Sequence, residues 1–220
     1  MIVDERMITY INSLDTSNPS WLNEVERAAR EDRVPVIRQE MQSFLRVFLE
    51  LKQPEHILEI GTAVGFSALL MAEYTPSDCV ITTIENYEKR ILEARRNFAA
   101  SPHRDRITLL EGDALELLKE LEGSFDMIFM DAAKGQYIHF LPDVLRLLKR
   151  RGVLISDNVL QDGDIIESHY AVERRNRTIY KRMRDYLYVL KHTEGLQTCI
   201  VPIGDGAAVT IKTRDDVTLA

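Results

Sequence analysis

The sequence predicts an α/β fold in which helices cover both faces of a mostly parallel, seven-stranded sheet. From His56 onward, short apolar runs alternate with helical stretches, an alternation typical of strand–helix–strand units. The chain has 220 residues, of which 45% are hydrophobic, enough for one well-packed domain of this kind. The predicted strands cover residues 57–60, 80–84, 107–110, 127–130, 153–156, 198–203 and 207–212. The helices that alternate with them cover residues 65–74, 87–99, 114–121, 135–149 and 175–190.

The first fifty residues are predicted to form helices rather than strands. A capping sequence with Pro19 at the helix start precedes a helix over 21–30, and apolar residues at helical spacing predict another over 39–51. Val34-Pro35-Val36 is an extended break between these two helices. We therefore expect a single domain made of a helical cap over 1–52, a core over 53–213 and a frayed tail over 214–220.

The last two predicted strands are joined by Gly204-Asp205-Gly206. Glycines on both sides of an aspartate are typical of a tight turn. We therefore expect an antiparallel hairpin at the edge of the sheet.

Composition and charge exclude several classes of protein. No run of 18 apolar residues occurs, which excludes a transmembrane helix, and the first residues do not resemble a signal peptide. The two cysteines, Cys79 and Cys199, stand in apolar runs and are predicted to be core residues, so a cytoplasmic protein is expected. A net charge of −7 argues against general nucleic-acid binding, so any RNA partner would need a local basic patch.

A glycine-containing turn follows the first predicted strand and opens a helix. Gly61 and Gly65 allow a close approach of the backbone to a ligand, but the third glycine of a dinucleotide fingerprint is missing. Glu59, just before the turn, suits a ligand that carries an ammonium group better than one that carries phosphates. Glu85 ends the second strand, where a carboxylate accepts ribose hydroxyls, and Asp113 and Ala114 follow the third, where an adenine edge would lie.

These features together indicate S-adenosylmethionine as the ligand. The alternative interpretation is that the glycines only form a turn and that both glutamates are surface acids. A nicotinamide-dependent oxidoreductase is a further alternative, which the missing glycine disfavours.

A second group of polar residues follows the fourth and fifth predicted strands. Asp131, Asp157 and Asn158 offer three oxygen donors, and without a nearby histidine or cysteine such a set favours Mg²⁺. Lys134 stands three residues after Asp131, and a neighbouring divalent cation disfavours its ammonium form, so Lys134 is a candidate general base. The alternative interpretation is that the aspartates cap helices and that the lysine is solvated.

The chain from about residue 34 to residue 212 resembles the cation-dependent O-methyltransferases of the catechol and caffeoyl-CoA type. The resemblance rests on Leu58-Glu59-Ile60-Gly61-Thr62, Gly65-Phe66-Ser67, Asp131-Ala132-Ala133-Lys134, Asp157-Asn158 and Pro202-Ile203-Gly204-Asp205-Gly206. It implies a Rossmann-like class I methyltransferase fold and a homodimer, since relatives commonly pair.

The resemblance also implies roles for individual residues. Mg²⁺ would bind Asp131, Asp157 and Asn158, while Lys134 would be the base and Asp131 would also lie close to the methyl-donor sulfur. Cofactor contacts are implied for Val36, Glu59, Gly61, Ser67, Glu85, Asp113, Ala114 and Asp131.

The acceptor is predicted to be an ionisable hydroxyl. Carbon methylation of pyrimidines commonly needs a cysteine nucleophile, and methylation of amino groups usually shows a different motif after the fourth strand. A catalytically idle binding module would have no need of the metal and lysine set.

Basic residues close behind the predicted metal ligands bear on the substrate. Five of them, which we expect to contact phosphates, are Arg174, Arg175, Arg177, Lys181 and Arg182. The whole chain also resembles the bacterial tRNA 5-hydroxyuridine methyltransferases, which implies methylation of the 5-hydroxyl at the wobble position of the anticodon to give 5-methoxyuridine. Two alternatives stay open: a small catechol or phenol as substrate, and a solvated helix whose charge is balanced by Glu167, Glu173 and Asp185.

Overall fold

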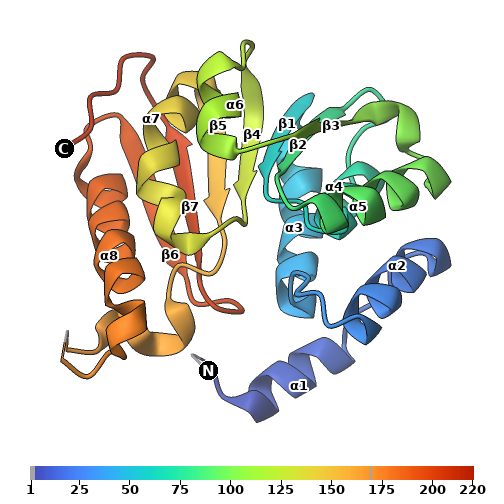
Figure 1. Ribbon diagram of the computed structural model, residues 1–220, viewed down its shortest axis with the longest axis horizontal. Coiled ribbons are helices and arrows are strands. Elements are labelled where there is room, and N and C mark those ends of the chain that lie inside the picture. Colours follow the sequence, from blue (N-terminus) through green and yellow to red (C-terminus); the bar gives the residue numbers. More distant parts are fainter. Residues whose placement is uncertain (1–2, 169) are drawn as a thin grey trace. The chain divides into compact units, whose positions relative to one another are not determined.

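The computed structural model describes residues 3–168 and 170–220 (Figure 1). The chain forms two compact units. The first unit is Glu5–Ala114, and the second contains Leu115–Ala220 together with Val3 and Asp4. Each unit combines a parallel pair of strands with helices, as the alternating pattern predicts.

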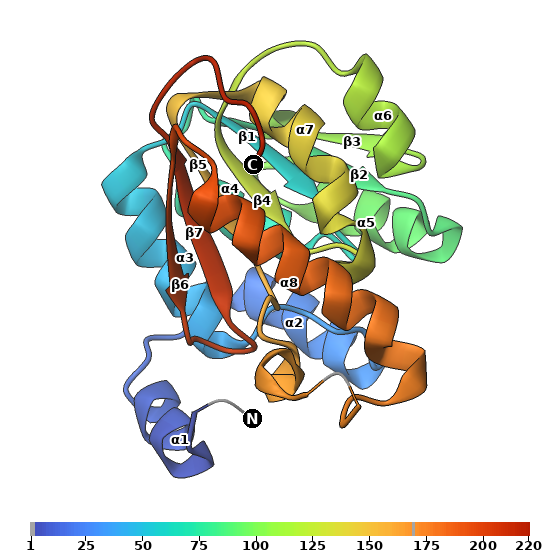
Figure 2. The same ribbon diagram turned by 90° about the vertical axis from the view of Figure 1, so that its left-hand side faces the viewer.

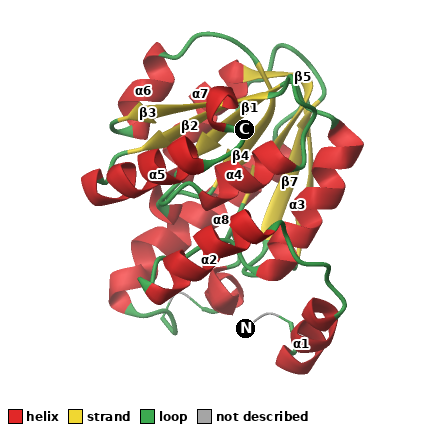
Figure 3. Cartoon of the chain, turned by 90° about the vertical axis from the view of Figure 1, so that its right-hand side faces the viewer, coloured by secondary structure: helices red, strands yellow, loops and turns green. Residues whose placement is uncertain are grey.

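The first unit contains the N-terminal helices and three strands. Strand β2 pairs in parallel with β1 on one side and with β3 on the other. Figure 3 shows these strands with α4 and α5, which pack against β2 and β3. The elements of this unit are α1 (Glu5–Ser13), α2 (Ser20–Glu31), α3 (Gln39–Lys52), β1 (His56–Ile60), α4 (Phe66–Glu73), β2 (Val80–Glu85), α5 (Glu88–Ala100), a 3-10 turn (Arg104–Arg106) and β3 (Ile107–Glu111).

The second unit contains four strands and the C-terminal helices. Strand β5 pairs in parallel with β4 and antiparallel with β7, and β7 pairs antiparallel with β6. Helix α8 packs against α7 and β6, as Figure 2 shows. The elements are α6 (Ala114–Glu120), β4 (Phe125–Met130), α7 (Tyr137–Leu147), β5 (Leu148–Ser156), α8 (Arg177–His192), β6 (Leu196–Val201) and β7 (Ala207–Lys212), with 3-10 segments at Lys134–Gln136, Gln161–Ile166 and Arg174–Asn176.

The fifth strand begins earlier than its apolar run predicts. The helix predicted over 135–149 ends at Leu147, and β5 starts at Leu148 rather than at Val153. Leu148 pairs with Phe125 of β4, and the register shifts between Phe125 and Met127. The charged residues at 149–151 therefore belong to an irregular start of the strand, which hydrophobic periodicity does not detect.

Two further expectations are wrong. Cys199 is exposed rather than buried. Side chains alternate between the two faces of β6, and Cys199 lies on the exposed face whereas its neighbour Thr198 lies on the half-buried one. Cys79 is buried as expected. Residues 214–220 have no helix or strand, yet the amide of Ala220 donates a hydrogen bond to the Thr193 hydroxyl (3.2 Å) and Arg214 pairs with Glu194. The C-terminal segment is therefore held by side-chain and backbone contacts and does not form a frayed tail.

Candidate active site

The three predicted metal ligands lie at one edge of the second unit. Asp131 follows β4, while Asp157 and Asn158 follow β5, and Met130 and Ser156 are paired across these two parallel strands. The Asn158 side-chain amide donates to Asp131 Oδ1 (2.9 Å), and the Asn158 backbone amide donates to Asp157 Oδ1 (2.7 Å). Parallel register therefore brings the three oxygen-bearing side chains together.

Of the two carboxyl groups at this edge, that of Asp157 is buried and that of Asp131 is half-buried. Burial, and next to it the negative charge of Asp131, raise the pKa of Asp157 to about 7. Burial also raises the pKa of Asp131, while the hydrogen bond from Asn158 and the positive charge of Lys134 partly offset this rise. Two crowded carboxylates and an amide oxygen are the donor set that a divalent cation stabilises, so the residues present fit Mg²⁺.

Lys134 is tied to a residue that the sequence analysis treats only as part of a turn. The Lys134 ammonium donates to Asp205 Oδ2 (2.7 Å), and Asp205 is only 2% exposed. The second oxygen of Asp205 accepts the backbone amide of Asp162. Asp205 lies 71 positions after Lys134, so no local spacing signals this pair.

The backbone between β5 and this loop is unusual. Asn158 (φ 59°), Gln161 (φ 52°) and Asp162 (φ 51°) adopt the left-handed conformation. Such conformations cost about 1–3 kcal/mol each and persist only where the surroundings enforce them. Here the β6–β7 turn does so, because the amides of Val159 and Leu160 donate to the carbonyls of Gly206 and Asp205 (both 2.9 Å).

A buried tyrosine contacts the backbone next to the predicted metal ligands. The Tyr137 hydroxyl is within hydrogen-bond distance of the carbonyls of Met130 (3.2 Å) and Asp157 (3.1 Å). Burial raises the pKa of Tyr137 well above its ordinary value, and the charges of Asp131 and Asp157 raise it further, so the hydroxyl keeps its proton. Nothing in the local sequence of Tyr137 distinguishes it from an ordinary core aromatic residue.

The predicted cofactor turn lies in the first unit and is organised by Glu85. One oxygen of Glu85 accepts the Ala63 amide (2.8 Å), and the other accepts the amides of Asn86 and Tyr87 (both 2.9 Å). The amide of Gly61 donates to the carbonyl of Ile84 (3.0 Å). These bonds fix the ends of β1 and β2 and the turn that follows β1.

Glu59 and Ser67, both predicted cofactor residues, contact each other. Glu59 is fully buried, and its carboxylate accepts hydrogen bonds from the hydroxyls of Ser67 and Thr83. The alternative of a surface acid is therefore wrong for Glu59.

The other predicted cofactor residues vary in exposure. Val36 and Ala114 are half-buried, and Asp113 is exposed just before α6. Asp131 belongs to the second unit, so it lies apart in the chain from the rest of the cofactor set.

The five basic residues predicted to bind phosphate lie on the 3-10 turn at 174–176 and on α8. Arg175 pairs with Glu173 (2.7 Å), and Lys181 pairs with Asp185 (2.6 Å), as the alternative of a balanced, solvated helix anticipates. In contrast, Arg177 donates to the Val172 carbonyl (3.1 Å) and Arg182 to the Gly135 carbonyl (3.0 Å).

Carbonyl oxygens carry no formal charge. Arg177 and Arg182 therefore keep positive charge that these hydrogen bonds do not neutralise. Arg182 bonds to the residue directly after Lys134, which places this charge close to the candidate base.

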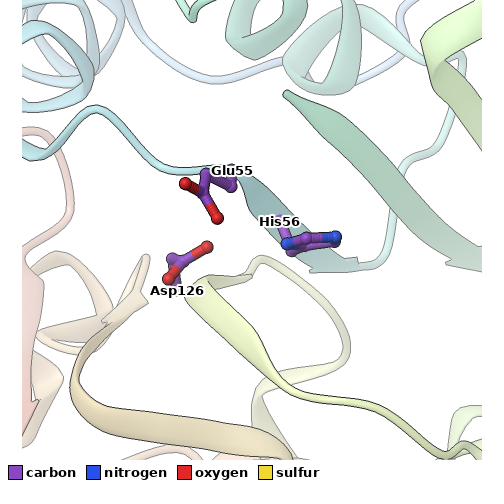
Figure 4. Close-up of side chains that lie close together, drawn as sticks. All are labelled: Glu55, His56 and Asp126. Carbon is purple, nitrogen blue, oxygen red and sulfur yellow. The ribbon is translucent and has the colours of Figure 1, made fainter. Parts of the chain in front are cut away.

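Three further titratable side chains are drawn in Figure 4. Glu55 and His56 are exposed residues at the start of β1 in the first unit. Asp126 belongs to β4 in the second unit, where it accepts a hydrogen bond from Lys149 (2.9 Å). We assign no function to these three residues.

The fold is that of the class I methyltransferases, with a seven-stranded mixed sheet and C-terminal antiparallel strands. The S-adenosylhomocysteine-bound methyltransferase PaMTH1 of Podospora anserina superposes with a TM-score of 0.85 at 28% identity, covering 94% of each chain. A Staphylococcus aureus protein provisionally assigned as a caffeoyl-CoA O-methyltransferase superposes with a TM-score of 0.83 at 31% identity, covering 94% of this chain and 98% of that one.

Sequence comparison identifies the family more narrowly. The signature of the family described as O-methyltransferase matches residues 13–213. Caffeoyl-CoA O-methyltransferase 1 of Eucalyptus globulus is 31% identical over 176 residues, which cover 74% of this chain and 69% of that protein. Catechol O-methyltransferase of Niastella koreensis is 32% identical over 130 residues, which are 57% of this chain and 59% of that protein. The chain belongs to this family of S-adenosylmethionine-dependent O-methyltransferases.

Across the described ranges 3–168 and 170–220, none of the helices combines the length and the apolar character needed to span a membrane.

Proposed function

We propose that the chain transfers the methyl group of S-adenosylmethionine to one hydroxyl of a vicinal oxygen pair on a planar ring, with Mg²⁺ bound at the Asp131–Asp157–Asn158 edge. The observation that carries this proposal is the meeting of two carboxyl groups, one buried and one half-buried, with an amide side chain in a unit that also contains the Lys134–Asp205 pair. Asp131, Asp157 and Asn158 would hold the Mg²⁺ cation, which would then also be open to oxygens of the substrate.

Each residue has a definite task in this reaction. Asp131, Asp157 and Asn158 would hold Mg²⁺, which acidifies a hydroxyl bound to it. Lys134 would take the hydroxyl proton, and Asp205 would orient the Lys134 side chain and stabilise the ammonium that results. The deprotonated oxygen would attack the methyl carbon in line while the bond from that carbon to the cofactor sulfur breaks and S-adenosylhomocysteine leaves. Most of the rate enhancement would come from positioning and charge stabilisation.

The first unit would bind the cofactor. Glu85 would accept the ribose hydroxyls, and Asp113 and Ala114 would line the adenine. The methionine end would lie against Gly61, Ser67 and Glu59, with Val36 covering it. The buried hydrogen bonds of Glu59 with Ser67 and Thr83 support this placement, because they hold these side chains in fixed positions.

Two kinds of substrate carry the required oxygen pair. A catechol or related phenol is the first, and the names of the curated relatives favour it. The second is 5-hydroxyuridine at the tRNA wobble position, whose 5-hydroxyl and neighbouring O4 form a similar chelate. The positive charge of Arg182 beside Gly135, the residue after Lys134, favours this second substrate, and Arg177 adds a further positive charge at the start of α8.

The decisive experiment offers both acceptors to the purified protein. Labelled S-adenosylmethionine is incubated with a catechol and, separately, with tRNA that contains 5-hydroxyuridine, each with Mg²⁺ or with a chelator. We expect label in at least one acceptor, lost with the chelator. Label in tRNA recovered as 5-methoxyuridine assigns the RNA substrate, and label in the catechol alone assigns the small phenol. Transfer that is insensitive to the chelator would contradict the metal-dependent proposal.

A further inference from the structure

The backbone segments that carry the proposed metal ligands Asp131 and Asp157 are linked by hydrogen bonds at the carbonyl oxygen of Met130. The oxygen of Met130, the residue before Asp131, accepts the amide of Asp157 (3.0 Å). The Tyr137 hydroxyl lies 3.2 Å from that same oxygen and 3.1 Å from the carbonyl oxygen of Asp157. One side chain therefore reaches the backbone at both ligand-bearing strand ends.

The hydrogen bonds of the Tyr137 hydroxyl oppose the electrostatic repulsion between Asp131 and Asp157. The half-buried Asp131 lies close enough to the buried Asp157 for its negative charge to disfavour the ionised form of Asp157, so the two carboxylates repel each other. Before a cation binds, their repulsion favours a separation of the ends of β4 and β5. The Tyr137 hydroxyl, held between the carbonyls of Met130 and Asp157, opposes that separation. The carboxylate oxygens of Asp131 and Asp157 are therefore kept near their proposed metal-binding positions.

The ring of Tyr137 is itself held rigidly. Tyr137 is fully buried, and it packs edge-on against Tyr186 with ring centres 5.6 Å apart. Because the ring has little freedom, the position of its hydroxyl is determined by the core of the second unit rather than by the ligands.

We propose that Tyr137 is a positioning residue for the metal site, whose hydroxyl sets the spacing of Asp131 and Asp157 through their backbone. The inference rests on the proposed function, since it assumes that these residues bind Mg²⁺. Residues that orient metal ligands without touching the metal commonly change metal affinity about 10–100-fold when they are mutated.

Tyr186 provides a matched control. It is also fully buried, and its hydroxyl also makes a hydrogen bond, but to the side chain of Ser156 (2.6 Å) rather than to the backbone at a ligand. Tyr137→Phe and Tyr186→Phe each remove one buried hydroxyl and keep the ring. Both substitutions are expected to lower the melting temperature of the metal-free protein by similar amounts.

The test measures the binding of Mg²⁺ alone, by calorimetry and by the rise in melting temperature with Mg²⁺ concentration. We expect Tyr137→Phe to weaken Mg²⁺ binding about 10-fold or more, and Tyr186→Phe to bind Mg²⁺ as the native chain does. Native-like binding in Tyr137→Phe, or an equal loss in Tyr186→Phe, would overturn the inference and leave the proposed function intact. Absence of Mg²⁺ binding in the native chain would instead overturn the metal-dependent function on which the inference rests.

Discussion

The Asp205 side chain joins two parts of the candidate site that no local motif connects. One carboxylate oxygen accepts the Lys134 ammonium, and the other accepts the Asp162 amide. An asparagine would keep one carbonyl oxygen for the Asp162 amide and turn an NH₂ group toward Lys134. Asp205→Asn therefore removes the ion pair with Lys134 while it keeps the hydrogen bond that holds the Asp162 amide.

We expect Asp205→Asn to lower the turnover number about 10–100-fold with little change in Mg²⁺ binding, because the base loses the group that orients it. Turnover is measured on whichever acceptor the labelled-cofactor experiment identifies. Asp126→Asn, which removes the carboxylate partner of Lys149, is the control for loss of a lysine–aspartate pair elsewhere in the second unit. Equal turnover in Asp205→Asn and the native chain would remove Asp205 from the mechanism.

The raised pKa of Asp157 links metal binding to pH. In the metal-free protein its pKa is about 7, against an ordinary value of 3.8, so the folded state binds this proton more tightly than the unfolded state. The stability that this proton contributes is fully present below the ordinary pKa and is lost as the pH rises through about 7. Mg²⁺ bound to the Asp157 carboxylate, as we propose, would displace the same proton, so its affinity would increase over the same range.

We therefore expect the rise in melting temperature caused by Mg²⁺ to be small at about pH 6 and to reach its full size by about pH 8. Melting curves with and without Mg²⁺ across this range test the expectation. Asp157→Asn should abolish both the Mg²⁺ effect and this part of the pH dependence. A Mg²⁺ effect that is constant with pH would show that Asp157 does not bind the metal as a carboxylate.

At the scale of elements, the β6–β7 turn supports the strained loop that follows Asn158. Gly206 has φ 84°, and a Cβ atom added there would lie 2.3 Å from Cγ of Leu160. The absence of a side chain at Gly206 is thus what lets the loop pack closely on the turn.

Gly206→Ala is expected to destabilise the protein by about 1–3 kcal/mol, and to expose the amides of the 158–163 loop to hydrogen exchange. Gly123→Ala is the matched control, because Gly123 also has positive φ but nothing lies within 4 Å of an added Cβ. If both variants lose the same stability and show the same exchange in the loop, the close packing at Gly206 has no special role.

The sequence predicts those parts of the fold and site that depend on short spacings. Alternating patterns predict every strand of the two units, and residues at the carboxyl ends of parallel strands are expected to meet, as Asp131 and Asn158 do. What the sequence did not predict depends on long-range contacts. Asp205 is 71 positions from Lys134, and Tyr137 reaches a carbonyl 20 positions away. The early start of β5 depends on its pairing with Phe125, which periodicity within β5 does not encode.

Across the whole molecule, the predicted contacts to the methyl donor and the groups that would act on the acceptor occupy separate stretches of chain. Apart from Asp131, every predicted cofactor residue lies in Glu5–Ala114, and the predicted metal ligands, the candidate base Lys134 and its partner Asp205 all lie in Leu115–Ala220. Selection for a new acceptor can therefore alter the later stretch while the earlier one stays constant. On this assignment, substitutions that change the acceptor would fall after codon 114, and those that change the methyl donor would fall mainly before it.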